Sequence, residues 1–155
     1  MRKTVTGKPL TELEVFIGEW RVDAVHARNP AELLHGRAAF EWWPAGERTF
    51  VLERWSMEHP DFPDSINLIG ATQPDGGLAI HYYDTRGVHR VYLMSFKDAT
   101  WTVSRKRKAG SKTDFDQRFV GEFSADRRTI TGEWQRTDPG KSQMMHDLDV
   151  TYTKL

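Results

Sequence analysis

The sequence predicts an all-β protein, an antiparallel up-and-down barrel of about ten strands with a short N-terminal helix. Three observations lead to this fold class. Apolar and polar residues alternate with period two along most of the chain after residue 18. Turn residues recur between these segments, and most connections are short. Ten strands are near the limit for an open twisted sheet, so closure of the sheet is the economical way to bury its apolar face. The competing architecture is a two-sheet sandwich, whose crossovers usually need longer connections.

The composition indicates one globular domain over residues 1–155. Hydrophobic residues make up 38% and charged residues 28%, which is typical of a folded chain with a real core. The net charge of +0 favours neither a nucleic-acid nor a membrane partner, and the absence of cysteine excludes disulfides and thiolate sites. The polar, basic segment 1–8 is not a signal peptide, and no apolar run approaches a membrane span. We therefore expect a cytoplasmic protein.

A helix is expected over Pro9–Phe16, because Pro9 suits the first helical position and Leu10, Leu13 and Phe16 recur at helical spacing. Gly18 ends this helix, and the first strand follows it as far as the break at Asn29-Pro30. The further strands are expected at residues 36–43, 48–57, 65–72, 78–84, 88–96, 100–107, 115–123, 129–136 and 144–154. A strong turn signal, Pro74-Asp75-Gly76-Gly77, separates the fourth and fifth strands, and the charged run 105–112 is interpreted as a solvated hairpin tip.

A short pattern, Gly-Glu-aromatic, recurs at Gly18-Glu19-Trp20, Gly121-Glu122-Phe123 and Gly132-Glu133-Trp134. In each copy the glycine and the aromatic residue share one face of the strand. Glycine inside a strand marks a bend or a close approach, and a large ring nearby can fill the space that it leaves. The pattern is structural and indicates no reaction.

Alternation along each strand predicts which side chains face the barrel interior. The expected interior residues are Trp20, Phe40, Leu52, Tyr82, Tyr92, Met94, Trp101, Phe119, Trp134 and His146. The third strand leaves two alternatives open. Arg54 faces inward with Leu52 and then needs a carboxylate or an anionic ligand, or Glu53 and Trp55 face inward and Arg54 is a surface charge. A β-bulge would reverse any of these assignments.

The chain resembles the calycin group of lipocalin-like barrels, in its N-terminal helix followed by Gly18-Glu19-Trp20 and a long antiparallel meander. Its ten strands resemble the fatty-acid-binding-protein and nitrobindin branches more than eight-stranded lipocalins. The segments 82–88, 117–121 and 146–152 resemble a bacterial family of uncharacterised lipocalin-like proteins. The resemblance implies a ligand-holding barrel without implying an established activity. The Arg-x-Tyr carboxylate anchor typical of fatty-acid-binding proteins is replaced by Thr151-Tyr152-Thr153.

His146 carries the implication of the nitrobindin branch, whose members place a haem-ligating histidine on the last strand. It shares parity with Leu148 and Val150, so it is expected to face inward, either as a hydrogen-bonded core residue or as a haem ligand. The glycine-rich start of nitrobindins is not matched here. No histidine pair has the spacing of a metal site.

The sequence carries no nucleophile elbow and no phosphate-binding glycine loop, so no catalytic residue is assigned. A barrel of more than about eight strands leaves interior room for a ligand, and we expect non-enzymatic binding of a small, mostly apolar molecule. The alternatives are a haem protein with His146 as axial ligand, a barrel enzyme of isomerase or hydratase type, and a filled structural barrel that dimerises through Trp43 or Trp55. The predicted ligand-binding residues are Trp20, Phe40, Arg54, Tyr82, Tyr92, Met94, Trp101, Gln117, Phe119, Trp134 and His146.

Overall fold

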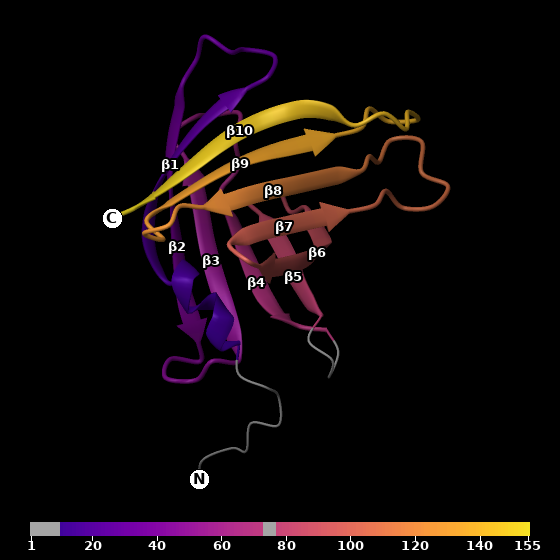
Figure 1. Cartoon of the computed structure of the whole chain (residues 1–155). Helices are drawn as coiled ribbons and strands as arrows, with labels where there is room; N and C mark the ends of the chain where they lie inside the picture. Colours follow the sequence, from indigo (N-terminus) through magenta and orange to yellow (C-terminus); the bar gives the residue numbers. More distant parts are fainter. Residues whose placement is uncertain (1–9, 73–76) are drawn as a thin grey trace.

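Ten antiparallel strands form a closed barrel in the computed structural model, which describes residues 10–72 and 77–155 (Figure 1). Each strand pairs with its neighbours in sequence, and β1 closes the barrel against β10. The predicted fold class is therefore confirmed. The strands are β1 (Gly18–His26), β2 (Leu34–Trp43), β3 (Phe50–Met57), β4 (Ser65–Ala71), β5 (Leu78–Asp84), β6 (His89–Lys97), β7 (Thr100–Arg105), β8 (Gln117–Phe123), β9 (Thr129–Arg136) and β10 (Met145–Lys154).

The predicted helix is a 3₁₀ helix, η1 (Thr11–Phe16), rather than an α-helix. Pro9 and residues 74–76 of the predicted turn lie outside the described part of the chain. Phe16 at the end of η1 is fully buried, and its carbonyl oxygen accepts a hydrogen bond of 2.8 Å from the indole nitrogen of Trp20. Four further rings surround Phe16 at centroid distances of 5.0–5.5 Å, from Phe40, Phe96, Trp101 and Phe123. This aromatic cluster ties η1 to β2, β6, β7 and β8 and fills the adjacent part of the interior.

Gly121 and Gly132 lie opposite each other on β8 and β9, and the ring of Phe119 covers both. A Cβ atom on Gly132 would lie 2.4 Å from Phe119 carbons, and one on Gly121 would lie 2.9 Å from them. In two of the Gly-Glu-aromatic copies, glycine is therefore required because the Phe119 ring lies close to the backbone. The position of these glycines inside strands predicted such a close approach. The ring that fills the space comes from Phe119, two residues before the first of these glycines.

On the third strand the structure confirms the second alternative, and the expected inward position of Leu52 is wrong. Val51, Glu53 and Trp55 face the interior, and the exposed Arg54 forms an ion pair with Glu41 on the outer surface. Residues directly opposite in an antiparallel pair share a face, and Glu53 pairs with the buried Phe40. The inward position of Phe40, which was predicted, therefore requires Glu53 to face inward too.

A β-bulge overturns the inward assignment of His146. The register of β10 against β9 shifts between His146 and Leu148, so one extra residue separates the two side chains. Leu148, Val150 and Tyr152 are buried as predicted, but His146 is exposed on the outer face and Asp147 reaches the interior cavity.

Candidate functional site: the interior cavity

A cavity of about 460 Å³ lies inside the barrel. Its volume falls in the range that holds a small organic ligand. Aromatic and aliphatic side chains from five strands, β5, β6, β7, β9 and β10, form most of its wall. These residues are Ile80, Tyr82, Tyr92, Trp101, Val103, Trp134, Leu148, Val150 and Tyr152.

Glu53 is the buried carboxyl group of this cavity, with 5% of the residue exposed. The side-chain nitrogen of Asn67, on the neighbouring strand β4, donates a hydrogen bond of 2.7 Å to its Oε1 atom. Burial raises the pKa of Glu53 to about 7, and the hydrogen bond from Asn67 opposes only part of this rise. Near neutral pH this group therefore exchanges a proton inside an apolar space, which is the property of a general acid or base.

Tyr152 is buried beside this carboxyl group. Burial raises the pKa of its phenol well above the usual value, the negative charge of Glu53 adds to the rise, and a hydrogen bond with Trp55 opposes it. The phenol thus stays protonated. Trp55, Tyr152 and Asn67 all line the cavity with Glu53, so they form one polar region in an otherwise aromatic wall.

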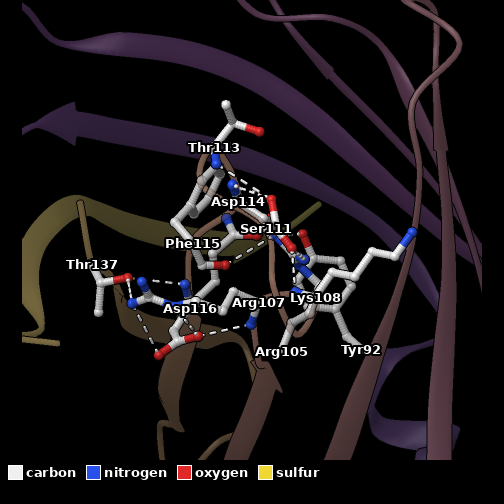
Figure 2. A network of polar contacts seen from close by, with 11 residues as sticks. Tyr92, Arg105, Arg107, Lys108, Ser111, Thr113, Asp114, Phe115, Asp116 and Thr137 are labelled. Carbon is white, nitrogen blue, oxygen red and sulfur yellow. Dashed lines mark hydrogen bonds and ion pairs between the residues drawn. The ribbon is translucent and has the colours of Figure 1, made fainter. Parts of the chain in front are cut away.

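The loop between β7 and β8 brings a further aromatic side chain, Phe115, to the cavity. Figure 2 shows the polar contacts that hold this loop. Arg105 donates two hydrogen bonds to the Asp114 carboxylate, of 2.8 and 3.0 Å, and a third of 3.1 Å to the carbonyl oxygen of Phe115. The backbone nitrogen of Lys108 adds a bond of 2.7 Å to Asp114. Most of the run 105–112 is exposed, as predicted for a solvated tip, but Arg105 at its start is half-buried and its contacts fix Phe115.

A second set of contacts secures the same loop to Thr137, the residue that follows β9. The buried hydroxyl oxygen of Thr137 accepts hydrogen bonds from Arg107 (2.8 Å) and from the backbone nitrogen of Asp116 (3.0 Å). Arg107 also forms an ion pair of 3.2 Å with Asp116 (Figure 2). Hydrogen bonds from Arg107 lower the pKa of the Asp116 carboxyl group, so this pair is charged at neutral pH.

Three guanidinium groups gather around the ring of Phe115. The Cζ atom of Arg136 lies 3.9 Å from the ring centroid, and those of Arg90 and Arg105 lie at 5.3 and 5.4 Å. Arg90 and Arg136 themselves line the cavity. Cations placed near an aromatic ring are stabilised by its electron-rich face, which allows positive charge to be held beside an apolar space.

The structure brings five of the sequence-predicted site residues together at the cavity, where Tyr92 donates a hydrogen bond of 2.8 Å to Gln117. These five are Tyr82, Tyr92, Trp101, Gln117 and Trp134. Four others are buried without lining the cavity, namely Trp20, Phe40, Met94 and Phe119. Arg54 and His146 lie on the outer face.

His146 does not fit the haem arrangement that the nitrobindin resemblance implied. Its Nδ1 atom lies 2.7 Å from Glu133, its Nε2 atom lies 3.2 Å from Asp149, and the hydrogen bond with Glu133 raises its pKa. Both ring nitrogens are thus engaged on the outer surface. No histidine lines the cavity in the part of the chain that the structure describes, and no cluster suited to a metal ion occurs among the same residues.

Of the charged residues in the cavity wall, the sequence analysis offered Glu53 only as one of two alternatives and did not assign Arg90 or Arg136. The strand periodicity did hold a signal for these two arginines. Arg90 shares parity with Tyr92, and Arg136 shares parity with Trp134. Charged residues near strand ends usually face water, so parity alone does not place these two arginines in the interior.

The chain matches no protein-family model, and no curated protein matches its sequence. Among solved structures, it is similar to the crystal structure of Rv2717c from M. tuberculosis. The TM-score is 0.63, and the superposition covers 94% of this chain and 96% of that one. Because the sequences are only 10% identical, the similarity concerns the fold. Among the described residues, no helix is long and apolar enough to cross a membrane.

Proposed function

We propose that this protein binds a small, mostly apolar molecule inside the barrel and acts as a carrier or sensor. The observation that carries the proposal is the cavity of about 460 Å³ with its aromatic wall. Ligand sites are typically concave, mostly apolar and supplied with a few placed polar groups, and this cavity has each of these features. The proposal includes membership of the calycin group, which the closed antiparallel order of the strands supports.

Native mass spectrometry of protein purified from its own host tests this proposal directly. The expected result is a co-purified small molecule that is lost when the cavity is filled. Val103→Phe adds a ring on the cavity side of β7, whereas Thr102→Phe adds the same ring on the outer face as a matched control. Retention of the molecule by both folded variants, or its absence from the parent protein, would contradict the proposal.

A second candidate, an enzyme that moves a proton within the cavity, is favoured by Glu53. Its carboxyl group lines the cavity and has a pKa of about 7, as a general acid or base requires. Glu53→Gln separates the two functions. A carrier keeps its ligand in this variant and returns it unchanged, whereas an enzyme binds the molecule and loses its turnover.

A further inference from the structure

We infer that the ligand carries an oxyanion on its apolar body, and that Arg90 and Arg136 hold this group. The inference rests on the proposed function and specifies the class of ligand. The chemistry required is a carboxylate or a phosphate ester, because both present oxygen atoms that accept hydrogen bonds from a guanidinium group.

The arginines around the cavity divide into paired and unpaired groups. Arg86 is paired with Asp84 at 2.8 Å, and Arg105 is paired with Asp114. Within residues 10–72 and 77–155, the side chain of neither Arg90 nor Arg136 forms a hydrogen bond or an ion pair, and both guanidinium groups lie against the Phe115 ring. Two cations at a cavity wall without a carboxylate partner favour an anionic ligand.

Neither aspartate of the wall, Asp61 or Asp147, forms an ion pair with Arg90 or Arg136. The Oδ1 atom of Asp147 lies 3.4 Å from Nε2 of His26, and the Oδ2 atom of Asp61 lies 3.9 Å from Nδ1 of His59. Glu53 is separated from Arg90 by three strand-to-strand steps through Asn67 and Tyr82, which corresponds to about 14 Å along the sheet. The anionic group of a ligand therefore supplies the ion-pair partner that Arg90 and Arg136 lack among the described residues of the wall.

The buried side-chain atoms without a hydrogen-bond partner point to the same conclusion. Among the described residues these atoms are Nε1 of Trp101, Nε of Arg105 and Nε of Arg136. All three are N–H donors, and two of them belong to residues that line the cavity. Trp101 is only 4% exposed. A buried donor without an acceptor is costly, so an oxyanion bound at Arg136 satisfies its open Nε donor. Trp101 lies farther along the barrel, since it pairs with Gly121 whereas Arg136 pairs with Gln117.

The Phe115 ring orients the Arg136 side chain before a ligand binds. At 3.9 Å from the ring centroid, the guanidinium group of Arg136 is held against the aromatic surface, and the loop that carries Phe115 is fixed by the Arg105–Asp114 pair. A guanidinium group that is already oriented loses less conformational entropy when it binds an oxyanion. Apolar walls and an oriented cationic end together define an amphipathic anion as the ligand.

Three naphthalene probes of similar size test the inference by calorimetric titration: 1-naphthylacetate, 1-naphthyl phosphate and the neutral 1-naphthaleneacetamide. The expected result is that at least one anionic probe binds roughly tenfold or more tightly than the amide, as for charge-assisted hydrogen bonds. Arg136→Gln and Arg90→Gln should each remove most of this preference and leave amide binding nearly unchanged. Arg54→Gln removes an arginine from the outer face, and it should change neither the preference for the anionic probe nor the binding of the amide.

The outcomes separate the inference from the proposed function. Equal binding of the amide and both anions would show that Arg90 and Arg136 do not hold an oxyanion, and so would a preference that persists in folded Arg90→Gln and Arg136→Gln. Either result would leave the proposed binding function intact. Binding of none of the probes would overturn both. If Arg136→Gln does not fold, the salt dependence of probe binding to the parent protein still tests the inference. Anion affinity that falls as salt is added, beside amide affinity that does not, supports the anchor, and two equal salt responses refute it.

Discussion

Glu53→Gln should stabilise the protein at alkaline pH and leave its stability unchanged at acidic pH. The side chain keeps its shape, and its remaining oxygen still accepts the hydrogen bond from Asn67. The variant loses only the ability to ionise. In the unfolded chain the carboxyl group has a pKa near the ordinary value of 4.5, whereas burial raises it to about 7 in the folded protein.

The sign and the magnitude follow from this rise. Between pH 4.5 and about 7 the folded protein binds more protons at this site than the unfolded chain does, so stability falls as the pH increases. Below this window the group is neutral in both states and costs nothing. Above it the buried charge costs about 3 kcal/mol, since each unit of pKa corresponds to about 1.4 kcal/mol.

Urea unfolding of parent and variant at pH 4.5, 6 and 8 measures this cost. We expect the difference in unfolding free energy to grow from near zero to about 3 kcal/mol in favour of the variant. Glu41→Gln, on the outer face opposite Leu52, is the control and should show no comparable growth with pH. A difference between parent and Glu53→Gln that is constant across this range would refute the burial of Glu53 as the cause.

Three further predictions concern other parts of the barrel. Gly132→Ala should lower stability by about 1–3 kcal/mol in thermal or urea unfolding, because its Cβ would lie 2.4 Å from Phe119; an unchanged midpoint would contradict this packing. Asp114→Asn should weaken the Arg105 contacts that fix the β7–β8 loop, and amide hydrogen exchange should accelerate in residues 106–116 while the strand amides of β1 and β2 stay protected. His146→Ala should leave the response to a hemin titration followed by absorbance unchanged, because this side chain lies on the outer face; a Soret band that the variant alone loses would show that His146 binds haem.

Several parts of this structure were predictable because they depend on local chemistry. Alternation located the ten strands, with β5 and β9 matching the predicted bounds in full. The short turns required antiparallel neighbours, and the number of strands favoured closure. The inward aromatic residues of β5 to β9 followed from their parity, so most of the aromatic wall could be predicted from the chain alone.

The tertiary structure decided the charged part of the cavity. On β3, Leu52 and Val51 are both apolar, so periodicity gave no reason to prefer one face, and pairing of Glu53 with Phe40 settled the matter. On β10, a single extra residue turned His146 outward. Because side chains alternate with period two, one shift in register exchanges the faces of all residues beyond it.

The grouping of Arg90, Phe115 and Arg136 shows the same limit at a larger scale. These residues come from β6, the β7–β8 loop and β9, and each is unremarkable among its sequence neighbours. The sequence by itself determined a closed barrel with aromatic side chains inside. Which charges share that interior was decided only by pairing between strands, because pairing sets the register that points each side chain inward or outward.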